Sequence, residues 1–332
     1  MKMRKFLPTI ALTLGFSILT AGCAAGNKTV AFSPLWQQSN LTGSDPIDET
    51  LTYKVNFEKG AGLANINYSF AYENGTYTTQ LVSKTEGAAT VYEYRTKFSI
   101  DVTYTFNGVD SEPFTDSVET YAKFYGDGNL LKPIESSKTT VSHSPRSGRE
   151  HASLTTCYSE FNQKVETKYN ADGSGTCTVT DNTLKENNKS TANFTKDEKY
   201  TCIDNETLLL AVRAIGASTT SATVEVYNQV VNAMQKINIS FVVPREDQET
   251  GDREFSYKEM VDGEWKEVKK AISYREVNLS LKDKNPGTTQ KAWVAQSNPI
   301  ANTYRNVLLR VEMPLAYDFG TLIYSLDSVD RK

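Results

Sequence analysis

From Ala89 to Phe106 the sequence alternates between two kinds of side chain over its longest regular stretch. Even positions from Tyr92 onward are aromatic or aliphatic apart from one threonine, whereas odd positions from Glu93 onward are charged or hydroxylated. This alternation predicts a strand with one buried face and one solvated face. At about 3.3 Å per residue the strand would extend for roughly 50 Å, longer than most strands, so we expect it to bend within a strongly curved sheet.

The remainder of the chain also favours strands, since it holds 18 Tyr and 14 Phe together with many Thr and Val. Turn signals predict hairpins at Asn74-Gly75 and at Asp262-Gly263. Residues 182–199 are rich in Asn, Lys and Thr, and predict a loop. No internal repeat or break in composition divides the chain, so we expect a single β-domain over residues 49–332.

One segment, near residues 204–216, has the periodicity of a helix. Asp204 is placed to cap its start, Glu206 complements the helix dipole, and Gly216 is placed to end it. Apolar residues at helical spacing form one face, namely Leu208, Ala211, Val212 and Ile215. The predicted fold class is therefore mainly β, a large, strongly curved antiparallel sheet of half-barrel type with one main α-helix.

The first 22 residues have the pattern of a removable export signal. Lys2, Arg4 and Lys5 precede an apolar run, 6–19, that is shorter than the roughly 20 residues of a membrane-spanning helix. Thr20-Ala21-Gly22 directly before Cys23 resembles the lipobox of bacterial lipoproteins, although the family usually has Leu where Thr20 stands. The resemblance implies cleavage before Cys23 and palmitate-type acylation of its thiol; an ordinary signal peptide is the alternative.

This resemblance implies a signal peptide over 1–22, a flexible tether over 23–48, and a domain held at the cell envelope. Two acyl chains on Cys23 would make the membrane a partner of the protein. Ala24 is compatible with the outer membrane of a host with two membranes; in a single-membrane host the domain would face outward from the cell membrane. Removal of the leader leaves 33 basic and 40 acidic residues, a net charge of −7, which argues against a nucleic-acid partner.

The last third of the chain carries a second resemblance. Its segments are 206–213 (ETLLLAVR), 292–294 (AWV), 306–311 (NVLLRV) and 318–322 (DFGTL). Their order resembles the bacterial envelope β-proteins grouped as domain of unknown function 3108. The curved sheet of that group is similar in kind to the half-barrel of the outer-membrane lipoprotein carrier proteins. The group implies no general activity.

No catalytic residue, cofactor or metal site is predicted. Serine or cysteine nucleophiles usually need a histidine base fixed by a third group. The two histidines, His143 and His151, fall in a polar stretch, 142–153, that predicts a solvated loop, and no Gly-x-Ser-x-Gly elbow exists. With Cys157 they lack any recognised zinc spacing.

Three cysteines follow Cys23, an odd number for an exported chain. A hairpin centred on Asp172-Gly173 would place Cys157 on the order of 36 Å from Cys177, whereas a disulfide needs Cα atoms within about 7 Å. Folding residues 182–199 symmetrically brings Cys177 near Cys202. We therefore predict a Cys177–Cys202 bridge with Cys157 free, and three free thiols remain the alternative.

Two kinds of ligand follow from the aromatic residues. The apolar face of the long strand is predicted to line a site for a lipid or other hydrophobic ligand, with the helix as a lid. The residues of this face are Tyr92, Tyr94, Phe98, Ile100 and Tyr104. The alternative is that these residues fill the core beneath the helix. Exposed Trp36, Trp265 and Trp293 would instead stack on glycans. We expect a non-enzymatic binding or structural component of the envelope, with a glycan-binding or adhesion surface domain as the alternative.

Overall fold

A computed structural model describes residues 47–126, 131–148, 150–183, 188–215, 221–229, 232–242, 253–281, 289–295 and 307–331. The predicted signal peptide, Cys23 and all but the last two residues of the predicted tether lie outside these ranges. The described residues form mostly strands, with one α-helix, as the sequence predicts.

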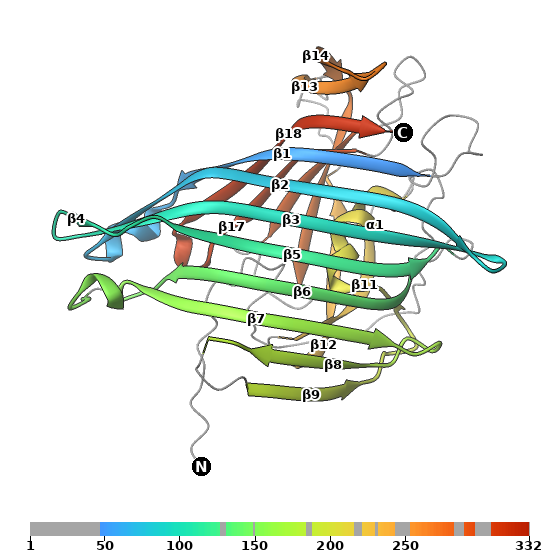
Figure 1. The fold of residues 1–332 in the computed structure, drawn as a ribbon, viewed down its shortest axis with the longest axis horizontal. Coiled ribbons are helices and arrows are strands. Elements are labelled where there is room, and N and C mark those ends of the chain that lie inside the picture. Colours follow the sequence, from blue (N-terminus) through green and yellow to red (C-terminus); the bar gives the residue numbers. More distant parts are fainter. Residues whose placement is uncertain are drawn as a thin grey trace.

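The first half of the domain is a run of long antiparallel strands, each paired with the next (Figure 1). A short strand, β4 (Val109–Asp110), pairs only with the end of β3. The strands are β1 (Asp48–Lys59), β2 (Ser69–Glu86), β3 (Ala89–Phe106), β5 (Phe114–Tyr125), β6 (Lys132–Pro145), β7 (Tyr158–Tyr169), β8 (Gly175–Asp181) and β9 (Asn188–Phe194). The predicted bounds of β3 are thus the observed ones.

The second half continues the sheet from the other edge of β1. The paired order from β1 is β18 (Gly320–Arg331), β17 (Leu308–Pro314), β16 (Gln290–Ala295), β15 (Tyr274–Leu281), β12 (Ala233–Phe241), β11 (Ser221–Asn228) and β10 (Thr201–Cys202). A hairpin of β13 (Arg253–Val261) and β14 (Glu264–Ile272) attaches to the end of β18. The sheet is antiparallel except for two-residue parallel pairings of β10 with β11 and of β13 with β18.

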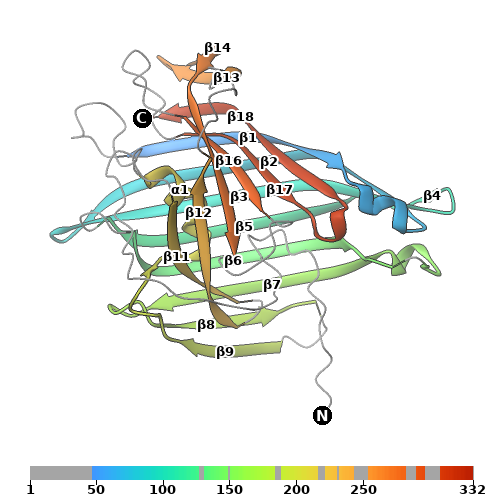
Figure 2. The same cartoon turned by 180° about the vertical axis from the view of Figure 1, so that it is seen from behind.

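Strong curvature brings the two halves face to face. Figure 2, seen from the opposite side, shows β11, β12, β16 and β17 crossing steeply in front of the long strands of the first half. The described strands do not close this half-barrel by hydrogen bonds between β9 and β11. Side chains join those edges instead, since Phe194 of β9 stacks on Tyr227 of β11 with ring centroids 4.3 Å apart.

The helix fills the space between the two layers. A 3-10 turn, η4 (Asn205–Thr207), leads into α1 (Leu208–Ala214), and all seven residues of α1 are buried. Asp204 caps the turn as predicted, because its Oδ1 accepts the backbone N–H of Glu206 at 2.8 Å. Further 3-10 turns are η2 (Ala61–Asn65), η3 (Leu154–Thr156) and η6 (Ala316–Asp318). The described part of the chain has no helix with the length and apolarity needed to cross a membrane.

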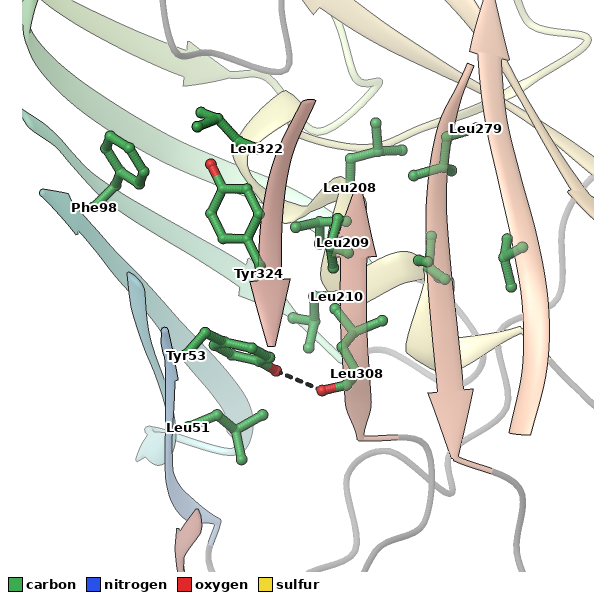
Figure 3. Close-up of a cluster of buried hydrophobic side chains, with 14 of the residues drawn as sticks. Leu51, Tyr53, Phe98, Leu208, Leu209, Leu210, Leu279, Leu308, Leu322 and Tyr324 are labelled. Atoms are coloured by element: carbon green, nitrogen blue, oxygen red, sulfur yellow. Dashed lines mark hydrogen bonds between the residues drawn. The ribbon is translucent and has the colours of Figure 1, made fainter. Parts of the chain in front are cut away.

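The main core forms where α1 meets both layers (Figure 3). Leu208, Leu209 and Leu210 pack among side chains of the first and last strands, and the Tyr53 hydroxyl donates to the Leu308 carbonyl oxygen at 3.0 Å. Each large apolar side chain buried in this way contributes about 1.5–3 kcal/mol. The helix is therefore an internal plug of the half-barrel and not an external lid.

Two local predictions are wrong. Asn74-Gly75 makes no hairpin, because β2 continues through it with a bulge against β3 and Asn74 at φ 53°. Asn74 Nδ2 donates to Asp101 Oδ2 at 3.0 Å, which helps to fix the bulge. Residues 182–199, predicted as a loop, contain β9, whose polar residues pair with β8.

Candidate functional site

A row of polar side chains runs along the inward face of β6. Every second residue is buried, and all five of these residues carry a hydroxyl or an amine: Ser136, Lys138, Thr140, Ser142 and Ser144. Buried polar groups need hydrogen-bond partners, so the row has to meet other polar groups inside the half-barrel. We call these five residues the polar row.

The polar row meets the entry of the helix. Ser136 Oγ donates to Asp204 Oδ2 at 2.6 Å, and the Tyr169 hydroxyl from β7 donates to the same oxygen at 2.7 Å. Lys138 Nζ lies 3.1 Å from Glu206 Oε1 in a buried ion pair. Burial raises the pKa of the Asp204 carboxyl to about 6, and the neighbouring Glu206 carboxylate acts in the same direction. These bonds fasten the start of the helix to β6 and β7.

A cavity of about 50 Å³ lies at the middle of the polar row. Lys138 and Glu206 form part of its wall, and Thr96 and Thr120 add hydroxyls that share a hydrogen bond of 2.8 Å. Small-molecule pockets usually measure about 300–1,000 Å³. The cavity therefore has room for a small polar group or a few water molecules and not for an acyl chain.

The predicted hydrophobic ligand face is part of the core. Its residues, Tyr92, Tyr94, Phe98, Ile100 and Tyr104, are between 0% and 7% exposed and belong to the main apolar cluster. The alternative, that they fill the core beneath the helix, is the arrangement observed. Only Phe98 among them reaches the wall of the cavity.

His143 is not in a solvated loop, whereas His151 lies in the loop that follows β6. β6 extends through Pro145, so His143 lies on a strand, where its Nδ1 is 3.1 Å from Oδ1 of the buried Asp116. The Phe114 ring stacks on His143 with centroids 4.1 Å apart. A histidine oriented by a carboxylate is two parts of a catalytic triad, but within the described residues no serine or cysteine bonds to this ring.

His151 has separate partners. Its Nδ1 donates to the Thr156 carbonyl oxygen at 2.8 Å, and its ring meets Tyr68 edge-on with centroids 5.0 Å apart. In the part of the chain that the structure describes, no group of three or more His, Cys, Asp and Glu residues is arranged to hold a metal ion.

Cys157, Cys177 and Cys202 are free, buried thiols, so the predicted Cys177–Cys202 bridge is not formed. The assumed symmetrical fold of residues 182–199 is wrong, because Cys177 faces Ala192 of β9. The other alternative, three free thiols, is the observed one. Burial raises the pKa of each of these thiols, that of Cys202 to about 12.

The polar row was not predicted from the sequence, where Asp204 and Glu206 were interpreted only as residues at the start of the helix. A signal existed: between Glu135 and Ser144, β6 has polar residues at both odd and even positions apart from Val141. Such a strand, if buried on one side, must carry polar groups inward. What the sequence does not reveal is the partner, since Ser136 and Asp204 are 68 residues apart.

Comparison with known proteins gives no family. No family model matches the chain, and no curated protein matches it. One solved structure with a similar arrangement is a crystal structure of a β-barrel-like protein of domain of unknown function DUF1849 from Brucella abortus. It is 8% identical in sequence, with a TM-score of 0.46, and the match covers 86% of this chain and 98% of that one.

Proposed function

We propose that this chain is an exported lipoprotein, held at the cell envelope by lipid on Cys23, and that its β-domain is a non-enzymatic binding or structural component. The basic and apolar leader and the Thr20-Ala21-Gly22-Cys23 sequence support export and lipidation. β1 begins at Asp48, so the domain starts 25 positions beyond the proposed anchor. The anchor would lie at the outer membrane in a two-membrane host and on the outer face of the cell membrane otherwise.

The main support for a non-enzymatic role is that the interior of the half-barrel is filled. α1 and the apolar cluster occupy its interior, and the charged groups there are engaged with one another in the polar row. A large hydrophobic ligand would have to displace this core. We therefore favour recognition of a small group, or of a partner at the outer surface.

A glycan-binding surface is the second candidate, and the β13–β14 hairpin favours it. Trp265 is 50% exposed there and lies opposite Met260 in the strand register. Such an exposed indole ring is suited to stacking on a sugar. Trp293, in contrast, is buried, with the Arg310 guanidinium 5.4 Å from its ring, and Trp36 lies outside the described residues.

Metabolic labelling with palmitate tests the anchor. We expect the wild-type chain to incorporate label in a bacterial host and to fractionate with membranes, and Cys23→Ala to lose both properties. Cys157→Ala is the matched control, since this thiol is buried within the domain. Labelling that survives in Cys23→Ala would refute the proposal.

A further inference from the structure

Three polar side chains meet where the polar row reaches the start of the helix: Lys138, Asn205 and Glu206. Glu206 Oε1 accepts hydrogen bonds from Lys138 Nζ and from Asn205 Nδ2, each at 3.1 Å. Because both nitrogen atoms bond to the same oxygen, they are no more than about 6 Å apart. An amine, a carboxamide and a carboxylate thus lie together, and the carboxylate contacts the other two groups.

These three side chains are buried. The side chains of Lys138 and Glu206 are 3% and 10% exposed, and Asn205 is 6% exposed. Glu206 is the one hydrogen-bond acceptor that Lys138 has among the described residues. Holding two charges in such surroundings with one bond is costly, and a proton passed from the ammonium group to the carboxylate removes both charges. The neighbouring wall is apolar, made by Phe98, Val118, Leu209 and Met313.

We propose that Lys138 and Asn205 react in the folded chain to form an isopeptide bond, with Glu206 as the catalytic residue. Proton transfer to Glu206 leaves a neutral primary amine, which is a nucleophile, beside the acyl carbon of a carboxamide. Lys138 Nζ adds to Asn205 Cγ, and the bond between Cγ and Nδ2 breaks. Nζ loses two protons in all, and Glu206 relays both to the departing nitrogen. That nitrogen leaves as ammonium, the Glu206 carboxylate is regenerated, and no oxidant or further reactant is needed.

The reaction requires a movement of Lys138 alone. Attack needs the reacting atoms about 3–3.5 Å apart, so Nζ has to turn from Glu206 towards the carboxamide carbon, which is one bond from Nδ2. The cavity of about 50 Å³ adjoins Lys138 and Glu206, and gives the flexible lysine stem room to move. Asn205 is held in place, because Asp204 caps the 3-10 turn that carries it.

The bond would join the inward face of β6 to the entry of the buried helix. It closes the intervening chain, which includes β7, β8, β9 and β10, into a covalent loop. Such a loop restricts the unfolded state in the way that a disulfide does. The bond requires neither export nor the lipid anchor, and so it goes beyond the proposed function.

Peptide mapping of the full chain, purified in detergent and unfolded before digestion, tests the proposal. Trypsin does not cleave after an acylated lysine, so we expect one branched peptide that joins residues 124–146 to residues 200–213. Its mass should be lower than the sum of the two linear peptides by one ammonia, about 17 Da. Tandem mass spectrometry should place the branch at Lys138 and Asn205.

Two variants separate the roles of the reacting groups. Asn205→Ala removes the acyl carbon and should give linear peptides only. Glu206→Gln keeps the size of the side chain but cannot relay protons, and should slow formation of the branch after refolding about a hundredfold or more. Lys97→Met, which breaks an exposed ion pair on β3, is the matched control and should leave the branch unchanged.

Linear peptides alone from the wild-type chain would overturn the inference. A branch that has lost water, about 18 Da, would place the bond on a carboxyl group and overturn the assignment to Asn205. A loss of ammonia without a branch would also count against it, since an asparagine that cyclises on its own backbone loses the same mass. The wild-type map decides between these outcomes even if a variant fails to fold.

Discussion

Arg213 Nη1 of the buried helix lies 2.7 Å from Glu49 Oε1 on the first strand. The last strand reaches the same carboxylate, since Arg331 Nη2 is 2.7 Å from Glu49 Oε2. Burial alone would raise the pKa of Glu49, but the two guanidinium groups lower it to about 2. One carboxylate thus joins β1, α1 and β18, and holds the end of the helix opposite to the one fastened by Asp204.

We expect Arg213→Met to destabilise the domain by about 3–5 kcal/mol, because the variant removes one partner from a buried ion pair. Urea unfolding followed by circular dichroism measures the change. The control is Lys97→Met, which breaks an exposed pair with Glu119 and should cost at most about 1 kcal/mol. Equal costs for the two variants would show that the buried pair does not hold the helix.

Acidification should stabilise the helix entry. The Asp204 carboxyl binds a proton more tightly in the folded chain, because its pKa rises from 3.8 to about 6. Its contribution to the free energy of unfolding is therefore fully present only below about pH 4 and is lost as the pH rises through about 6, a total change on the order of 3 kcal/mol. Urea midpoints between pH 4 and pH 7 measure this dependence.

Asp204→Asn is the variant that isolates the effect, since it removes the titrating group and keeps its size. The wild type should lose stability relative to Asp204→Asn between about pH 4 and pH 7 and stay at a constant difference above that range. Other titrating groups, including Glu49, cancel in the difference. A difference that does not vary with pH would contradict the assignment.

Most of the strand positions could be predicted because burial of one face leaves a period of two in the sequence. β3 shows this, since its even residues face the core and its odd residues face water. β9 left no such trace: from Asn188 to Thr191 its side chains are exposed on both faces, and pairing with β8 is what makes it a strand. The candidate site could not be predicted for a related reason, because Lys138 and Glu206 meet only after the sheet has curved around the helix.

The bulge at Asn74-Gly75 shows how tertiary contact overrides a turn signal, and it can be tested. A Cβ on Gly75 would lie 2.4 Å from the Val55 carbonyl oxygen of β1. We expect Gly75→Ala to lower the free energy of unfolding by about 3 kcal/mol, the upper end of the usual range for overpacking, because the backbone of the paired strand must move. Gly87→Ala is the control: it has φ 62° with nothing within 4 Å, so only backbone strain of about 1 kcal/mol opposes it. Chemical denaturation measures the free energy of unfolding of both variants. Equal losses would contradict the close approach of Gly75 to the backbone of β1.

The thiols give the last prediction. Because burial raises the pKa of Cys157, Cys177 and Cys202, little reactive thiolate forms near pH 8 in the folded chain. We expect native Cys23→Ser protein to react slowly with a chromogenic disulfide reagent, and the urea-unfolded protein to release three thiols per chain without reductant. A single thiol after unfolding, with peptide mapping that joins Cys177 to Cys202, would show that the exported protein forms the bridge. The seam between the two sheet edges would then be held by a covalent link as well as by the Phe194–Tyr227 stack.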